Sequence, residues 1–370
     1  MKKLCFLISH KPDIRYIKRF EALKSCFAIS VVFWNKDKEK SYFLFDGIDV
    51  YEIVVPANKT NPLKRLPQTL NFSKKAGKLL KQINPEIIYA GNLDMLSIAC
   101  KCKKRDSKIH IVYEVADLHR LIIDKQKNPI KQLISKTLKC KEKRCLKDVE
   151  LLVLTSMKFF DVYYCNLIGK ERVVFMPNMP DESTFSNFLK KKHSDFTVAF
   201  VGNIRYKDQL KMLIDAAGIV GVKVIFAGKD DEGNSFKELC SSFDYVTFLG
   251  EFDYKKQICD VYSSVDCIYS VYNADMFNVR IALPNKLYEA IYTAIPIIVA
   301  RNTYLEELVK QLGVGFSVNH NSKTELVELL QFLKNKPKEY LKAIEACLLE
   351  QRHQVLSNYN KVLISRLIIL

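Results

Sequence analysis

The segment Pro284–Glu289 combines residue types that can bind a phosphate-bearing ligand. It reads Pro-Asn-Lys-Leu-Tyr-Glu and continues into an apolar stretch, after which comes a short β-branched run, Ile297–Ala300. This order predicts a helix that begins near Pro284 or Asn285, then a turn and a buried strand. The first amides of a helix lack intrahelical partners and attract anions. We therefore expect Lys286 and these amides to face phosphates.

Glu289 admits two interpretations. Leu287, Ala290 and Ile291 share the inward face of the predicted helix. Glu289 points away from that face, so periodicity alone predicts a solvated side chain. The alternative is that Glu289 faces a cleft between two domains and accepts hydrogen bonds from ligand hydroxyls.

A second basic segment follows a predicted strand that ends at Gly202. Glycine lets the backbone approach a ligand closely, and Arg205 and Lys207 have the charge to neutralise a diphosphate. Solvated cations at a loop end are the commoner explanation of such a pair. Two further turns, at Gly228 and Gly250, follow strands of the same region. Together the three turns suggest one continuous ligand crevice.

The scaffold that positions these residues is an alternation of short apolar runs and longer amphipathic stretches, which is typical of βαβ units on parallel sheets. The predicted strands are 4–9, 28–34, 50–54, 86–90, 109–114, 151–155, 173–176, 197–202, 223–228, 246–249, 267–270, 297–300 and 315–318. The predicted helices are 14–24, 70–83, 95–103, 130–146, 158–167, 209–219, 236–241, 254–263, 286–294, 305–310 and 323–333. The fold class we expect is α/β with two doubly wound, Rossmann-like domains.

Two domains also fit the length of 370 residues. Two prolines near residue 180 and a charged segment before residue 195 interrupt the pattern, so we expect an N-terminal domain over 1–180 and a C-terminal domain over 195–350. The tail, 351–370, is helical and strongly apolar. It must pack back on the first domain or contact a lipid surface.

The net charge of +17 favours an anionic partner: nucleic acid, acidic lipid or a phosphorylated small molecule. The apolar run in Met1–Ser9 is too short for a signal peptide or a membrane span. Eleven cysteines without an export signal suggest free thiols in a reducing compartment. We expect a cytoplasmic protein, either free or peripheral on the inner face of the cytoplasmic membrane.

The order of motifs along nearly the whole chain resembles that of the retaining glycosyltransferases of family 4, which have the GT-B fold of two Rossmann-like domains facing a cleft. The most specific segment is similar to the Pro-x-Lys-Leu-Phe-Glu-Tyr motif of bacterial capsule and O-antigen members. The segments that carry the resemblance are Pro12–Arg15, Asn84–Asn92, Val112–Leu118, Leu152–Ser156, Pro177–Pro180 and Pro284–Glu289.

This resemblance implies a donor site for a nucleotide-diphosphate sugar, in which Glu289 binds the ribose hydroxyls while Arg205 and Lys207 hold the diphosphate. The donor-binding set that it implies is Gly202, Gly228, Leu249, Pro284, Asn285, Lys286 and Glu289, with Gly228 and Leu249 close to the base. Ile281 stands where the family often has another Glu, eight positions before the ribose-binding Glu.

For the acceptor, the resemblance implies contacts from the first domain. The candidates are Arg15, Asn92, Asp117 and His119, and Asp117 joins Glu289, Arg205 and Lys207 in the implied catalytic set. Ala116 replaces a His of the family, and His119 is equally well explained as an ordinary loop residue.

The implied reaction is metal-independent hexosyl transfer with retention of configuration, without a cofactor, to a glycan or polyprenyl-diphosphate-linked acceptor in cell-surface polysaccharide biosynthesis. Arg205, Lys207 and Lys286 would stabilise the leaving diphosphate, and the chain has no Asp-x-Asp triplet. The basic helix 131–144 can rest on anionic lipid; a solvated charged helix is the equal alternative.

Other functions remain open at this point. A nucleotide-sugar epimerase or hydrolase can use the same fold, and the departures at Ile281 and Ala116 are compatible with a non-catalytic scaffold. A basic nucleic-acid-binding protein is disfavoured, because the chain has one Trp, no zinc module and no separate helix-turn-helix.

Overall fold

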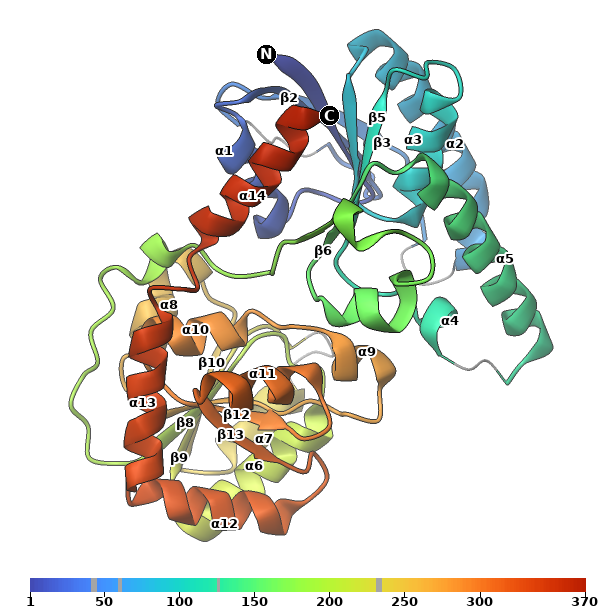
Figure 1. Ribbon diagram of the computed structural model, residues 1–370. Coiled ribbons are helices and arrows are strands. Elements are labelled where there is room, and N and C mark those ends of the chain that lie inside the picture. The colour runs from blue at the N-terminus through green and yellow to red at the C-terminus, as the bar shows by residue number, and fades with distance from the viewer. Residues whose placement is uncertain (41–44, 59–61, 125–126, 231–234) are drawn as a thin grey trace. The chain divides into compact units, whose positions relative to one another are not determined.

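The computed structural model describes residues 1–40, 45–58, 62–124, 127–230 and 235–370. These form two compact units (Figure 1). Unit 1 comprises Met1–Pro177 and Ser357–Leu370, and unit 2 comprises Asn178–Leu356. Each unit is built on one parallel β-sheet with helical crossovers, as the alternating sequence pattern predicts.

The sheet of unit 1 has the strand order β3-β2-β1-β4-β5-β6-β7. Its strands are β1 (Lys2–Ile8), β2 (Phe27–Asn35), β3 (Asp49–Val54), β4 (Ile87–Ala90), β5 (His110–Val115), β6 (Leu151–Leu154) and β7 (Val173–Phe175). The helices are α1 (Ile14–Leu23), α2 (Pro62–Ile83), α3 (Leu93–Lys103), α4 (Arg120–Ile123), α5 (Pro129–Cys145) and α14 (Leu356–Ile369). The helix predicted over 158–167 is instead a short π-helical turn, Phe160–Tyr164.

The core of unit 1 explains why its strands are apolar on both faces. Phe6 of β1 packs between Phe20 of α1 and Tyr89 of β4, with ring centroids 4.7 and 4.6 Å away. The C-terminal helix α14 inserts Leu363 and Leu367 into the same cluster. One apolar face of the tail is therefore covered by unit 1 itself, which removes the need for a lipid surface there.

The sheet of unit 2 has the strand order β10-β9-β8-β11-β12-β13. Its strands are β8 (Thr197–Val201), β9 (Lys223–Ala227), β10 (Val246–Gly250), β11 (Cys267–Ser270), β12 (Ile297–Ala300) and β13 (Gly315–Val318). The helices are α6 (Lys207–Val220), α7 (Ser235–Ser241), α8 (Tyr254–Tyr262), α9 (Phe277–Ile281), α10 (Lys286–Thr293), α11 (Tyr304–Leu312), α12 (Lys323–Lys334) and α13 (Lys338–Glu350).

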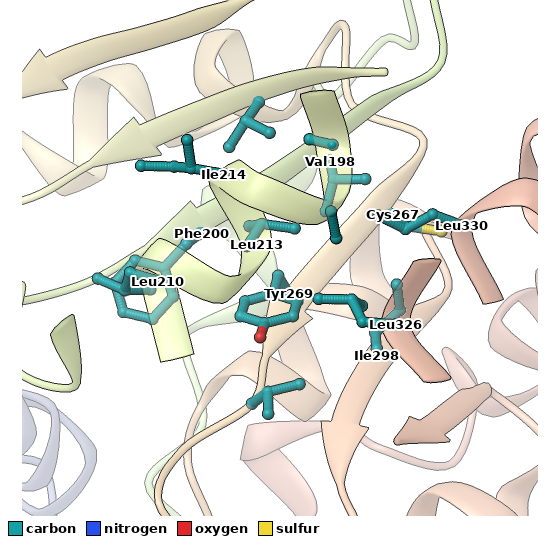
Figure 2. Close-up of a cluster of buried hydrophobic side chains, with 14 of the residues drawn as sticks. Val198, Phe200, Leu210, Leu213, Ile214, Cys267, Tyr269, Ile298, Leu326 and Leu330 are labelled. Atoms are coloured by element: carbon teal, nitrogen blue, oxygen red, sulfur yellow. The ribbon is translucent and has the colours of Figure 1, made fainter. Parts of the chain in front are cut away.

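Two helices of unit 2 pack their apolar stripes on one face of its sheet. Figure 2 shows Leu210 and Leu213 of α6, with Leu326 and Leu330 of α12, gathered around Tyr269 of β11. All of these side chains are buried. Their spacing of three or four residues along each helix is the pattern that predicted α6 and α12. Within the described ranges, none of the helices has both the length and the apolar character needed to cross a bilayer.

The segment that precedes β8 is fastened to unit 2 through Asp266, which lies just before β11. Asp266 is 1% exposed. Its Oδ2 accepts hydrogen bonds from His193 Nε2 at 2.7 Å and from the Thr197 amide at 2.9 Å. Lys190 and Lys336 lie 3.5 and 3.2 Å from its Oδ1. Burial acts to raise the pKa of Asp266, but the bonds from His193 and Thr197 outweigh it, so the net shift is downward.

A lowered pKa ties the stability of unit 2 to the charge of Asp266. The ionised Asp266 carboxylate contributes to the free energy of unfolding above the ordinary carboxyl pKa of 3.8. This contribution is lost as pH falls through the lower pKa that the group has in the folded state. We predict that Asp266→Asn lowers the free energy of unfolding by about 2–4 kcal/mol at pH 7, because it leaves buried donors with a neutral partner. The difference from the parent chain should shrink below pH 4. Thermal and urea unfolding across this range measures both effects.

Asp260→Asn is the matched control. Asp260 is well exposed and pairs only loosely with Lys191, at 3.8 Å, so its loss should cost little at any pH. Equal destabilisation by the two variants, or a difference that does not change with pH, would contradict the role of Asp266.

Candidate functional site

Both sheets reverse their strand order beside their first strand. The reversal falls between β1 and β4 in unit 1 and between β8 and β11 in unit 2. In open parallel sheets, ligands bind outside the carboxyl ends of the strands at such switch points. Most of the residues singled out from the sequence lie at these two edges.

The three strand-to-glycine turns of unit 2 lie side by side at its carboxyl edge. The Gly202 amide donates to the Ala227 carbonyl at 2.8 Å, and the Gly228 amide donates to the Gly250 carbonyl at 2.7 Å. Gly228 has φ +146°, and a Cβ there would stand 1.9 Å from the Gly202 carbonyl oxygen. No larger residue fits at this position, so Gly228 is required by the approach of two backbone segments.

Helix α10 places Lys286 beside the first of these turns. A Cβ at Gly202 would lie 3.9 Å from Lys286 Cε. Lys286 is buried and its Nζ lies 2.8 Å from Glu289 Oε2 and 3.0 Å from Oε1. The structure therefore brings Gly202, Lys286 and Glu289 together at the switch point.

Glu289 is not the solvated residue that periodicity alone predicts, because its exposure is 0%. Oε1 accepts hydrogen bonds from Tyr254 and Asn285, each at 2.8 Å. Oε2 accepts a hydrogen bond of 2.5 Å from Tyr262. Helix α10 is buried on nearly all sides, so the side of the helix away from the apolar stripe is also covered. The solvated interpretation is wrong for that reason.

The two tyrosines that hold Glu289 come from the ends of α8. Tyr262 is fully buried and Tyr254, the first residue of α8, is partly exposed. Burial and then the Glu289 charge raise the pKa of both phenols above the ordinary value. Both hydroxyls therefore remain protonated donors at neutral pH. No sequence motif identified them, since they lie 35 and 27 residues before Glu289.

Arg205 and Lys207 occupy different surroundings. Arg205 is exposed in the turn after β8. Lys207 begins α6, and its Nζ lies 3.0 Å from Ser235 Oγ and 3.3 Å from Asp230 Oδ1. Lys207 thus contacts Asp230 and the first residue of α7, Ser235, whereas Arg205 faces solvent.

An aromatic pair lies next to Arg205 and was not identified from the sequence. The rings of Tyr206 and Tyr272 are 5.1 Å apart. Burial raises the pKa of Tyr272 to about 12; the Glu289 charge adds to this rise, and the Arg205 charge opposes it. Tyr272 follows β11 at the switch point, so its position after a strand end is the one signal that could have identified it.

Two further residues of the predicted donor site, and Ile281, have simpler environments. Leu249, near the end of β10, is 48% exposed. Pro284 is partly buried directly before α10. Ile281 is buried at the end of α9, so the position where the family often has Glu contributes an apolar side chain.

The switch point of unit 1 contains a buried acid between two arginines. Glu114 of β5 is fully buried and accepts a hydrogen bond from Tyr89. Arg15 Nε lies 3.4 Å from its Oε1, and Arg19 Nε lies 3.8 Å from its Oε2. Among the described residues, neither Nε nor Oε1 makes a well-aligned hydrogen bond. Burial lowers the pKa of Arg15, but the Glu114 charge overrides this and raises it.

The other acceptor candidates lie near the same sheet edge. The Asn92 side chain donates to Ser9 Oγ and caps α3 by accepting from the Met95 amide at 3.1 Å. Asp117 and His119 are exposed after β5. His119 Nδ1 accepts from the Leu121 amide at 3.2 Å, which gives His119 a local role as the N-cap of α4.

In the part of the chain that the structure describes, no group of three His, Cys, Asp or Glu side chains is placed to hold a metal ion. The candidate site of unit 2 therefore consists of a buried carboxylate, one buried and one exposed cation, and tyrosine side chains.

Residues 181–347 match the family model described as Glycosyl transferases group 1. The succinoglycan biosynthesis protein ExoL of Rhizobium meliloti (strain 1021) is 23% identical over 238 residues, which cover 60% of this chain. The match spans 56% of that relative's length.

Two solved structures resemble the whole chain. Anabaena Alr3699/HepE in complex with UDP has a TM-score of 0.72 at 17% identity, with 100% of both chains covered. WaaG, described as a glycosyltransferase involved in lipopolysaccharide biosynthesis, has a TM-score of 0.71 at 13% identity, with 98% of both chains covered. The predicted fold class, GT-B with two Rossmann-like parallel-sheet domains, is confirmed by these likenesses.

Proposed function

We propose that this protein is a retaining, metal-independent hexosyltransferase of family 4. It transfers a sugar from a nucleotide-diphosphate donor to a glycan or lipid-linked acceptor in the biosynthesis of a cell-surface polysaccharide such as capsule or O-antigen. The group 1 domain and the likeness to ExoL support this class of reaction. The observation that carries the proposal is the Lys286–Glu289 pair beside Gly202 at the switch point of that domain.

The proposed chemistry follows from the charges at this edge. Cleavage of the donor develops negative charge on the leaving diphosphate, which exposed Arg205, Lys286 and the amino end of α10 can stabilise. The family's retaining reaction is commonly described as front-side attack by the acceptor hydroxyl. In that course no side chain acts as a nucleophile. HepE has also been solved with UDP-glucose, which supports a donor of this chemical class.

Donor binding by Glu289 requires an exchange of partners, because both of its oxygens are occupied. Tyr262 and Lys286 are buried, whereas Tyr254 is partly exposed at the start of α8. A ribose hydroxyl can replace the Tyr254 phenol on Oε1 with little loss of hydrogen bonding, since one neutral hydroxyl donor replaces another. We propose that this exchange admits the nucleotide.

Unit 1 supplies the acceptor side of the proposal. Its switch point presents Arg15 and Asn92 at the carboxyl edge, with Asp117 and His119 on the following loop. Arg15, which is only loosely paired with Glu114, can reorient toward a hydroxyl or an anionic group of a glycan. Exposed Ile130 and Leu133 stand among lysines on α5, which supports contact with an anionic, lipid-bearing surface on the cytoplasmic side.

The proposal predicts that one nucleotide-diphosphate sugar stabilises the folded chain. A thermal-shift panel of nucleotides and nucleotide sugars identifies it, because a ligand that binds only the folded state raises Tm.

Glu289→Gln should weaken binding of that donor and its turnover by about tenfold to hundredfold, since a hydrogen bond to a charged group is worth about 1.5–3 kcal/mol. Release of the nucleoside diphosphate measures turnover.

The control for this variant is Glu328→Gln, an exposed position on α12. It should bind and turn over the donor like the parent chain. A folded Glu289→Gln protein with normal turnover would falsify the assignment of Glu289 to the donor site.

The exchange of partners makes the two tyrosines inequivalent. We predict that Tyr254→Phe binds the donor as tightly as the parent or more tightly, because a competitor for Oε1 is removed. Tyr262→Phe should bind about tenfold more weakly, because Oε2 loses the donor that fixes the carboxylate. Isothermal titration with the donor measures both affinities. Equal losses in the two variants would show that Tyr254 is not displaced.

Metal independence is tested with the same donor. We expect turnover to be unchanged after dialysis against EDTA, because protein cations and the α10 amides carry the diphosphate charge. Parallel assays with added Mg²⁺ and Mn²⁺ serve as controls. Turnover that disappears with EDTA and returns with either ion would rule out the metal-independent mechanism while leaving glycosyl transfer intact.

A further inference from the structure

A groove of about 780 Å³ lies between α2 and α3 of unit 1, and nothing in the proposed reaction uses it. Its lining contains five cationic side chains and no carboxylate. They are Lys74, Lys78 and Lys81 of α2, Lys101 of α3 and Arg105 just beyond α3. Asn71 and Ser73 add neutral hydrogen-bonding groups to the same lining.

The cations of this groove are not balanced by neighbouring acids. In the described part of the chain, none of the five takes part in an ion pair with a carboxylate. Lys74 and Lys78 are four residues apart on one helix face, an arrangement of like charges that destabilises a helix. Lys81 and Lys101 lie in the last turns of their helices, where the helix dipole favours cations. The dipole does not account for Lys74 and Lys78, which lie further inside α2.

Gly77 is an independent sign that the groove is kept open. It lies in the interior of α2 and lines the groove. Glycine in a helix interior destabilises the helix relative to alanine. A Cβ at Gly77 would meet no atom within 4 Å, so packing within the chain does not require a glycine. The glycine therefore leaves the backbone of α2 open to the groove.

We propose that this groove binds an anion that carries at least two phosphate groups. Five cations around one concave surface match a diphosphate better than a single carboxylate, because each phosphate oxygen can accept a charge-assisted hydrogen bond. The C-terminal halves of α2 and α3 lead into the amino ends of β4 and β5. The groove is therefore nearer the sheet edge opposite to Ser9 and Asn92, and it is a separate site from the proposed acceptor site.

The test uses the full chain with inorganic pyrophosphate as the soluble probe, followed by isothermal titration at low salt. The double variant Lys78→Glu with Lys101→Glu should weaken one pyrophosphate site about tenfold or more, since two charge-assisted hydrogen bonds are lost and two negative charges are added. Gly77→Leu should remove the same site by filling the groove. It should keep or raise Tm, because leucine is the better helix former and its Cβ meets no atom within 4 Å.

Lys75→Glu is the matched control, since Lys75 is an exposed neighbour on α2 outside the groove lining. A second arm measures co-sedimentation with vesicles of phosphatidylcholine alone and of phosphatidylcholine with cardiolipin, a lipid whose headgroup carries two phosphates. If only the groove variants lose pyrophosphate binding, the ligand is soluble. If only the groove variants lose binding to the cardiolipin vesicles, the phosphates are lipid-borne, and both results support the site. Absence of binding to either probe, or equal loss in Lys75→Glu, would overturn it.

Discussion

The structure of unit 2 depends on how a carboxylate can be buried at the edge of a parallel sheet. An ionised carboxyl group taken out of water loses several kcal/mol of hydration unless charge and hydrogen bonds replace it. Glu289 meets this requirement with Lys286 and with hydroxyl and amide donors from α8 and from the start of α10. The same contacts fix α10 against α8 at the carboxyl edge. An electrostatic requirement of one side chain therefore determines where the candidate site is formed.

Unit 1 meets a comparable requirement less completely. Glu114 is as buried as Glu289, but its partners are one tyrosine hydroxyl and two arginines at 3.4 and 3.8 Å. Polar atoms left without aligned partners in a dry interior carry an energetic cost that a ligand can remove. The hydrogen-bonding capacity of Glu289 is thus taken up by its own neighbours, whereas the cluster around Glu114 has unused capacity. Under the proposed function, this contrast makes donor binding the more tightly specified of the two steps.

The sequence allowed the sheets to be predicted because parallel strands buried on both faces appear as short apolar runs, as in β1 and β12. It also located α10 and the Lys and Glu side chains in its first turn. The burial of Glu289 could not be predicted. Periodicity identifies only the apolar stripe of α10, whereas nearly every side of this helix is buried. Tyr254 and Tyr262 were missed because contacts between distant segments leave no local pattern. The ion pair between Lys207 and Asp230 was missed for the same reason.

The buried carboxylate of Glu142 anchors the helix that carries much of the cationic surface of unit 1. Glu142 of α5 is 1% exposed and accepts hydrogen bonds from the hydroxyls of Tyr113, Tyr163 and Tyr164 at 2.8–2.9 Å. Burial and then the charges around them raise the pKa of these phenols, so they stay donors. The opposite face of α5 carries exposed lysines that repel one another. The hydrogen bonds of Glu142 join the inner face of α5 to β5 and to the π-helical turn. These contacts stabilise α5 on the sheet and offset the repulsion among the lysines on its outer face.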